Sequence, residues 1–281
     1  MTTSPDHHGG PGSWSLKADR GPGAGPVPVV LVHGARTSAT MWRAQVVALA
    51  SLEPHVAGRR EVLAVDLPGH GVRRGERFTL DGAVEVVRDA VDSLGGRAMM
   101  VGLSLGGYVA LEFAAREPSR TEGVVAAACC TSPGGPLTWV WRQAVRLIEQ
   151  LPDGGAWLNS TLVRLVVPAA GAADLAAGGY ALDVMGDVLD ELGPSRPLRD
   201  LPQVTCPLWL VNGRWDHFRR QERAYLRAAT RAPLARLVVV RGASHLVSLT
   251  RPVAFSRVLL EAVEECDRAL SDRRLSEAAA T

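Results

Sequence analysis

The chain has 281 residues, with 31 Lys and Arg against 29 Asp and Glu and a formal net charge of +2. This length suits one large α/β domain, and a near-neutral balance without a dense basic run argues against a nucleic-acid partner. No apolar stretch approaches the ~20 residues that a membrane span requires, so we expect a soluble protein that does not associate with a membrane.

The N-terminal residues and the cysteines indicate the compartment. Residues 1–13 hold no apolar run and no Lys or Arg, which predicts a disordered tail rather than a secretory signal. The four cysteines lack CxxC spacing and lie mostly in apolar segments, as buried hydrophobic residues do. We expect a cytoplasmic protein with no disulfide, and because no ligand cluster or phosphate loop is visible, we expect no metal and no cofactor.

Short apolar runs alternate with helical patterns along most of the chain. Continuous apolar runs of this length are typical of strands buried on both faces, and the alternation predicts a mostly parallel, doubly wound α/β sheet. We assign residues 14–130 and 202–271 to this core and residues 272–281 to a flexible C-terminal tail. The expected strands are 27–32, 62–65, 98–101, 123–130, 207–211 and 235–240, and the expected helices are 40–52, 80–94, 105–117, 219–230 and 252–270.

Residues 131–201 interrupt this alternation. They contain no good strand, but three amphipathic helical patterns at 137–151, 156–167 and 172–192, bounded by Pro and Gly. This predicts a helical cap inserted between two strands of the sheet. Trp139, Trp141 and Trp157 lie in it, with Tyr180 and Met185 further along. The tryptophans either line a pocket for an apolar or aromatic substrate or fix the cap to the core.

The segment Gly102-Leu103-Ser104-Leu105-Gly106 matches G-x-S-x-G between an expected strand and an expected helix. Such a turn strains the serine backbone, needs glycine neighbours, and projects the hydroxyl over the end of the sheet. The motif by itself is common and also fits a chance glycine-rich turn. The strand before it and the helix after it favour a nucleophile.

Two further residues follow later strands in the order that such a nucleophile requires. Asp216 follows the strand at 207–211, and His245 follows the strand at 235–240. Since the carboxyl ends of parallel strands meet at one edge of the sheet, both can converge on Ser104. His245 would act as the proton carrier and Asp216 would orient it, in the chain order Ser, Asp, His.

A serine nucleophile also needs donors for the oxyanion that develops on the substrate. The backbone N–H of Leu105, directly after Ser104, is one expected donor. The N–H of Ala35, in the loop after the strand at 27–32, is the other. His33 in the same loop is expected to have a structural role. Arg36 either binds a substrate carboxylate or has the commoner role of a surface or structural arginine.

With these motifs the chain resembles the α/β-hydrolase superfamily, in the branch of bacterial esterases, cofactor-free haloperoxidase-like enzymes and carbon–carbon bond hydrolases. The resemblance covers residues 27–270, and residues 66–71 resemble the family's structural loop after the next strand. A serine nucleophile implies neither dehalogenase nor epoxide hydrolase chemistry, which use aspartate there. The chain lacks the glycine run after His33-Gly34 that many lipases carry, so a lipase of that type is not implied.

The predicted function is hydrolysis of an ester, thioester or related activated carbonyl of a small molecule through an acyl-enzyme. Acyl-transferring cyclisation, carbon–carbon bond hydrolysis and perhydrolysis would use the same three residues, so the sequence does not separate them. A ligand receptor that keeps these residues without turnover is the alternative from another class. The oligomeric state is not readable from the sequence.

Overall fold

A seven-stranded sheet forms the centre of the computed structural model, which describes residues 14–16, 25–51, 60–134, 136–151 and 153–279. The strand order is β1-β3-β2-β4-β5-β6-β7, in which β2 to β7 are parallel and β1 is antiparallel to β3. The expected tail at 1–13 lies outside the described residues. The strands are β1 (Trp14–Leu16), β2 (Val29–Val32), β3 (Val62–Val65), β4 (Ala98–Leu103), β5 (Thr121–Ala127), β6 (Leu208–Gly213) and β7 (Ala235–Val240).

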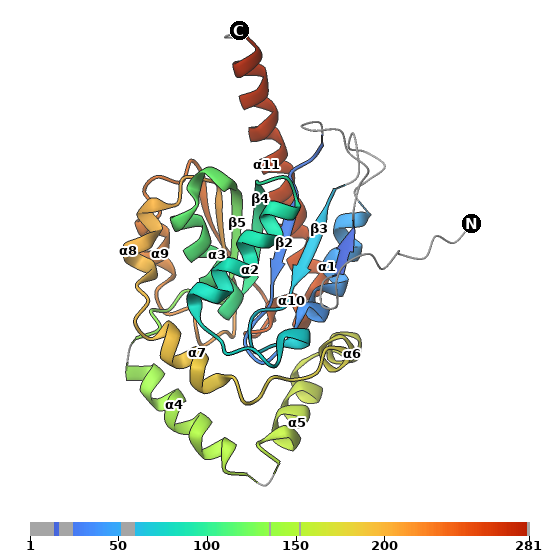
Figure 1. Ribbon diagram of the computed structural model, residues 1–281, viewed down its shortest axis with the longest axis vertical. Helices are drawn as coiled ribbons and strands as arrows, with labels where there is room; N and C mark the ends of the chain where they lie inside the picture. Colours follow the sequence, from blue (N-terminus) through green and yellow to red (C-terminus); the bar gives the residue numbers. More distant parts are fainter. Residues whose placement is uncertain (1–13, 17–24, 52–59, 135, 152, 280–281) are drawn as a thin grey trace, which may run out of the picture.

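Helices cover both faces of this sheet, as the alternating pattern predicts (Figure 1). Apolar residues of α2, α3 and α9 pack on one face, and those of α1 and α11 pack on the other. The doubly wound α/β fold is therefore confirmed. The helices are α1 (Arg43–Ala50), α2 (Leu80–Ser93), α3 (Leu105–Arg116), α4 (Pro136–Glu149), α5 (Ala156–Val166), α6 (Ala169–Ala177), α7 (Met185–Leu192), α8 (Pro197–Asp200), α9 (Glu222–Ala228), α10 (Val247–Thr250) and α11 (Pro252–Ala279), with short 3-10 helices at Ala39–Trp42, Gly71–Arg73, Pro118–Arg120 and Leu201–Gln203.

The sequence did not predict β1. This strand has three residues, and its pairing with β3 in the order Trp14 to Ala64, Ser15 to Leu63 and Leu16 to Val62 is a long-range contact. A three-residue segment is too short to show an alternating or continuous apolar pattern. Only the neighbouring strand β3 makes it a strand.

The segment between β5 and β6 is helical, and Figure 1 shows α4, α5, α6 and α7 gathered together beyond one end of the sheet. The pattern expected as one helix over 172–192 is instead two helices, α6 and α7. The glycines Gly178 and Gly179 follow the end of α6, and Gly179 has a φ of +72°, a left-handed conformation that ends helices.

The C-terminal helix is longer than expected. α11 continues to Ala279 and extends past the body of the molecule (Figure 1), so residues 272–279, which the sequence analysis assigned to a flexible tail, are helical. The sequence after residue 270 contains neither Gly nor Pro, and Arg273 forms an ion pair with the buried Glu122 of β5. This contact joins the added turns to the sheet.

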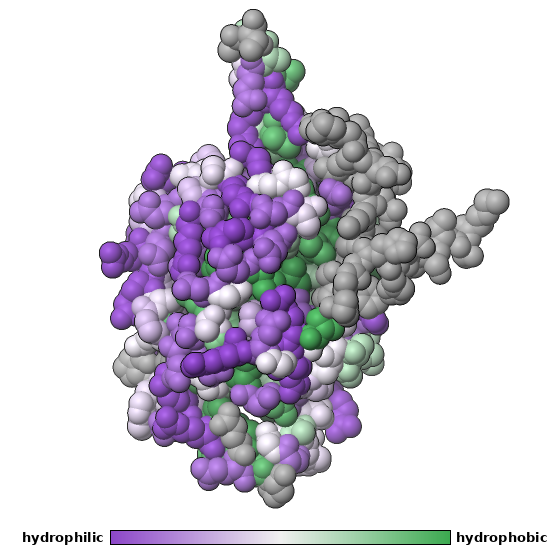
Figure 2. All heavy atoms as spheres, viewed as in Figure 1, coloured by the Kyte–Doolittle hydropathy of each residue, from purple (hydrophilic) through white to green (hydrophobic). Residues whose placement is uncertain are grey.

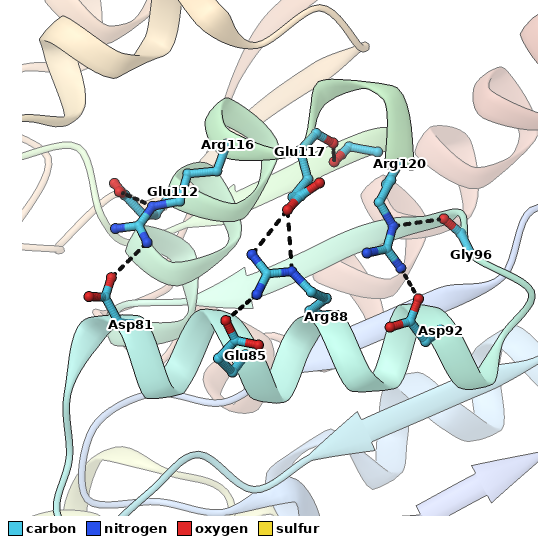
Figure 3. A network of polar contacts seen from close by, with 10 residues as sticks. Asp81, Glu85, Arg88, Asp92, Gly96, Glu112, Arg116, Glu117 and Arg120 are labelled. Atoms are coloured by element: carbon cyan, nitrogen blue, oxygen red, sulfur yellow. Dashed lines mark hydrogen bonds and ion pairs between the residues drawn. The ribbon is translucent and has the colours of Figure 1, made fainter.

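Charged side chains link the helices on one outer face. Arg88 of α2 pairs with Glu117 at 3.0 Å, and Arg116 of α3 pairs with Asp81 at 2.6 Å (Figure 3). Figure 2 shows this face covered mainly by hydrophilic side chains over α2 and α3, with hydrophobic residues visible lower down, where the inserted helices lie. Within the described part of the chain, no helix combines the length and apolar character of a membrane span, and the four cysteines are buried and free.

Candidate active site

Ser104 lies at the junction of β4 and α3, at the carboxyl end of a central strand. Its φ of 54° and ψ of −114° are strained for a residue with a side chain, as the G-x-S-x-G motif predicts. A Cβ at Gly102 would lie 2.0 Å from the carbonyl oxygen of Gly106, and one at Gly106 would lie 2.0 Å from that of Val32. Both positions therefore require glycine, and the tight turn holds the hydroxyl above the sheet edge.

His245 and Asp216 meet Ser104 at this edge. The Nε2 atom of His245 lies 2.9 Å from Ser104 Oγ, and its Nδ1 atom lies 2.9 Å from Asp216 Oδ1. An ionised carboxylate only accepts hydrogen bonds, so His245 donates from Nδ1 and presents Nε2 to accept from the serine hydroxyl. Three side chains from loops after β4, β6 and β7 thus form one continuous hydrogen-bonded chain.

The surroundings of Asp216 keep it ionised. Burial, the largest single influence, raises its pKa, but the hydrogen bond from His245, the charge of His245 and the Phe218 N–H together outweigh burial and lower the pKa below its ordinary value. The Phe218 N–H donates to Asp216 Oδ1 at 2.8 Å. A buried carboxylate of this kind fixes the imidazole orientation and stabilises its protonated form.

Leu105 and Ala35, whose backbone N–H groups are the predicted oxyanion donors, line one cavity together with Ser104. Leu105 begins α3, and the first N–H groups of a helix have no partner within it. None of the described hydrogen bonds uses the N–H of Ala35, and Ala35 lines two cavities together with Ser104. The positions of both residues fit the predicted donors.

Two cavities adjoin at Ser104. The larger, of about 270 Å³, is lined by His245, Arg36 and residues of α5, α6 and α7. The smaller, of about 90 Å³, is lined mainly by apolar side chains, among them Leu105, Tyr108 and Val188. Both are at the small end of ligand-site volumes, and most of their lining surface is apolar. Residues that line both cavities are Ala35, Ser104, Trp141, Met185, Leu189 and Phe218.

The three tryptophans expected at the site differ in whether they line a cavity. Trp141 lines both cavities, whereas Trp139 and Trp157 are 64% and 69% exposed and line neither. Trp139 and Trp141 are two positions apart on α4 and so point in different directions from the helix axis. The assignment of Trp139 and Trp157 to the substrate site is therefore corrected. Tyr180 and Met185 lie where a pocket role requires them, on the larger cavity.

The sequence analysis did not assign the aromatic residues that follow Asp216 to the substrate site. His217 and Phe218 both line the larger cavity, with ring centroids 5.2 Å and 4.9 Å from that of His245. Trp141 stacks on His217 with centroids 5.4 Å apart. Their position directly after a residue at the carboxyl edge of the sheet was the signal that could have identified them.

A buried histidine pair supports the loop that carries Ala35. His33 Nε2 accepts from the Leu67 N–H at 3.0 Å, and His70 Nε2 accepts from the Arg36 N–H at 3.1 Å. Burial lowers the pKa of His33 to about 4, and burial together with the nearby His33 lowers that of His70 to about 3. Both rings are neutral near pH 7, and the structural role predicted for His33 is confirmed.

Comparisons with known proteins agree with this architecture. The family model described as "Alpha/beta hydrolase family" matches residues 29–258. A pimeloyl-[acyl-carrier protein] methyl ester esterase of Nitrosospira multiformis is 34% identical over 124 residues, which are 42% of this chain and 44% of that protein. The corresponding esterase of Nitrosomonas europaea is 27% identical over 83% of this chain and 94% of its own length.

The first curated relatives are matched over less than half of their own length. Among solved structures, the enol-lactonase from Burkholderia xenovorans LB400 has a TM-score of 0.69 at 23% identity, covering 90% of this chain and 96% of that one. This similarity concerns the fold. With the family model matching most of the chain, the protein belongs to the alpha/beta hydrolase family.

Proposed function

We propose that the protein is a serine hydrolase that cleaves an ester, thioester or related activated carbonyl of a small molecule through an acyl-enzyme. The observation that carries this proposal is the chain from Ser104 Oγ to His245 Nε2 at 2.9 Å and from His245 Nδ1 to Asp216 Oδ1 at 2.9 Å. A base within hydrogen-bond reach of a serine, itself oriented by a buried acid, is the arrangement that activates this nucleophile.

The reaction follows from the positions of these groups. His245 takes the Ser104 proton as Oγ attacks the carbonyl carbon, and the N–H groups of Ala35 and Leu105 stabilise the oxyanion. As the tetrahedral species collapses, His245 returns the proton to the leaving group. Water then attacks the acyl-enzyme with His245 again acting as base, which releases the acid and restores Ser104.

The inserted helices act as a cap in this proposal. Trp141 of α4 and Met185 and Leu189 of α7 line both cavities beside Ser104, so these helices set the shape and apolar character of the substrate site. A cap that encloses the site also excludes water from the reacting carbonyl. Relatives named as methyl ester esterases support an ester as the cleaved bond.

Covalent labelling tests the assignment of the nucleophile. A fluorophosphonate should form one covalent adduct per protein molecule, visible in the intact mass, and peptide mapping should locate this adduct on Ser104. The Ser104→Ala variant should not be labelled and should lose ~10⁴-fold or more in turnover of a chromogenic butanoate ester. Labelling at another serine, or activity retained in Ser104→Ala, would contradict the proposal. A receptor without turnover would be labelled but would release product at most once.

A further inference from the structure

Arg36 is an arginine without an acidic partner inside the candidate site. Arg36 lines the larger cavity together with Ser104 and His245. Its Nε atom is buried and makes no hydrogen bond, and no carboxylate within the described ranges forms an ion pair with it. The surface arginines Arg88 and Arg116 are paired with carboxylates in Figure 3. Arg36 therefore keeps its hydrogen-bonding capacity for something that enters the cavity.

The backbone holds Arg36 in a fixed and strained position. Its φ is +65°, in the left-handed region that side-chain-bearing residues seldom occupy. The Arg36 N–H donates to His70 Nε2 at 3.1 Å, and its carbonyl accepts from the Ala181 N–H at 3.2 Å. Strain maintained by contacts on both sides is typical of functional positions. The backbone that carries the guanidinium is thus held in place before any ligand arrives.

The charge of Arg36 is not balanced by the acid of the site. Asp216 accepts hydrogen bonds from His245 and from the Phe218 N–H, and it does not line the cavity. Most other side chains on the larger cavity are uncharged, among them Trp141, Val163 and Leu175. A guanidinium binds a carboxylate through two parallel hydrogen bonds, and it does so more strongly where water is scarce. A small carboxylate is the ligand that this chemistry fits.

The two cavities differ in their access to the proton donor. His245 lines the larger cavity and is absent from the lining of the smaller one, which holds Leu105, Tyr108 and Val188. The leaving group must lie next to His245, because this residue returns the proton to it. The leaving group consequently occupies the same cavity as Arg36. The smaller apolar cavity of about 90 Å³ accepts a short acyl chain.

We propose that Arg36 binds a carboxylate carried by the leaving group, so that the preferred substrates are short-chain acyl esters of small hydroxy acids or phenolic acids. This inference rests on the proposed serine hydrolase function. It adds the charge of the substrate and the side of the scissile bond on which that charge lies. The reaction releases a free hydroxy acid or phenolic acid and a short fatty acid.

A matched pair of esters tests the charge. The probes are 4-(butanoyloxy)benzoate and its methyl ester, which share the acyl chain and differ by the leaving-group charge. We expect the wild-type kcat/KM, corrected for uncatalysed hydrolysis, to favour the charged ester by ~10-fold or more, the scale of a charge-assisted hydrogen bond. In Arg36→Met this ratio should fall ~10- to 100-fold. Arg36→Lys should lie between, because lysine keeps the charge without the planar fork.

Three controls separate the outcomes. Arg223→Met, on the exposed side of α9, should leave the ratio unchanged. Phenyl hydrogen succinate carries its carboxylate on the acyl side, and a larger loss with this probe in Arg36→Met would overturn the assignment of sides. Binding to the wild type provides a readout that does not depend on the folding of a variant, since 4-hydroxybenzoate should inhibit more strongly than 4-hydroxybenzamide.

Failure of this inference differs from failure of the proposed function. Equal kcat/KM for both esters in the wild type, with Ser104 still labelled by the fluorophosphonate, would overturn the role of Arg36 alone. No turnover of either ester together with an unlabelled Ser104 would overturn both. A charge preference that is lost in Arg36→Met and kept in Arg223→Met supports the carboxylate site.

Discussion

The imidazole ring of His217 lies beside that of His245, with ring centroids 5.2 Å apart and planes inclined at 38°. Of these two residues, His245 forms the hydrogen bond to Ser104, with its Nε2 atom 2.9 Å from the serine Oγ. His217 instead stacks on Trp141. Proximity alone would not distinguish the two histidines. The hydrogen bond to Ser104 assigns the predicted role of base to His245, and the ring contacts of His217 assign it a packing role.

We expect His245→Ala to reduce kcat for a chromogenic ester by ~10⁴-fold or more, since it removes the base that hydrogen-bonds to Ser104. His217→Ala should cost ~10-fold or less, the scale of a lost aromatic contact. Steady-state kinetics on the two purified variants would decide. If His217→Ala were the inactive one, the proton carrier would have to be reassigned.

Asp216→Asn should lower kcat by ~10⁴-fold while the protein stays folded. The amide has the shape of the carboxylate, but it can turn its NH₂ group toward His245 Nδ1. That would favour the tautomer in which Nε2 carries the proton and no longer accepts from Ser104. Activity assays combined with thermal unfolding measure both effects. An active Asp216→Asn, or one whose inactivity follows from unfolding, would argue against an orienting role.

The tryptophans of the inserted helices provide a matched set. Trp141→Ala should change the ratio of kcat/KM for hexanoyl and acetyl esters by ~10-fold, because Trp141 lines both cavities. Trp139→Ala and Trp157→Ala should leave this ratio within about twofold, since both side chains are exposed and line neither cavity. A panel of acyl esters on the three variants tests this. The cap proposal fails if Trp141→Ala lowers stability and leaves the ranking of acyl groups unchanged.

The two buried histidines predict that the free energy of unfolding decreases as the pH is lowered. Burial lowers the pKa of His33 to about 4 and that of His70 to about 3, while in the unfolded chain both titrate near 6.5. Between about pH 6.5 and pH 4 the unfolded state therefore binds protons that the folded state does not. The free energy of unfolding should fall as pH falls through this window, by up to about 1.4 kcal/mol per pH unit for each histidine.

Urea unfolding at several pH values between 7.5 and 5 measures this slope. His70→Gln removes one titrating group and keeps an oxygen that can accept from the Arg36 N–H, so its stability should depend less on pH than that of the wild type. An identical slope in both proteins would show that His70 titrates normally in the folded state.

Local patterns in the sequence were sufficient to predict the fold class and the meeting of Ser104, Asp216 and His245. Strands buried on both faces appear as continuous apolar runs, and residues that follow parallel strands are placed at one edge of the sheet by topology alone. The glycines at 102 and 106 predicted the strained turn because no other residue fits there. Each of these inferences depends on neighbours in the chain or on strand direction.

Only the tertiary structure distinguished Trp141 from Trp139 and Trp157, because composition reports how many tryptophans a segment holds and not which way each one faces. The tertiary structure also determined that β1 is a strand and that α11 continues past residue 270. β1 pairs with β3, and the ion pair between Arg273 and Glu122 joins the last turns of α11 to the sheet. Arg36 is the clearest case. Its left-handed backbone is held by contacts with His70 and Ala181, which lie 34 and 145 residues further along the chain.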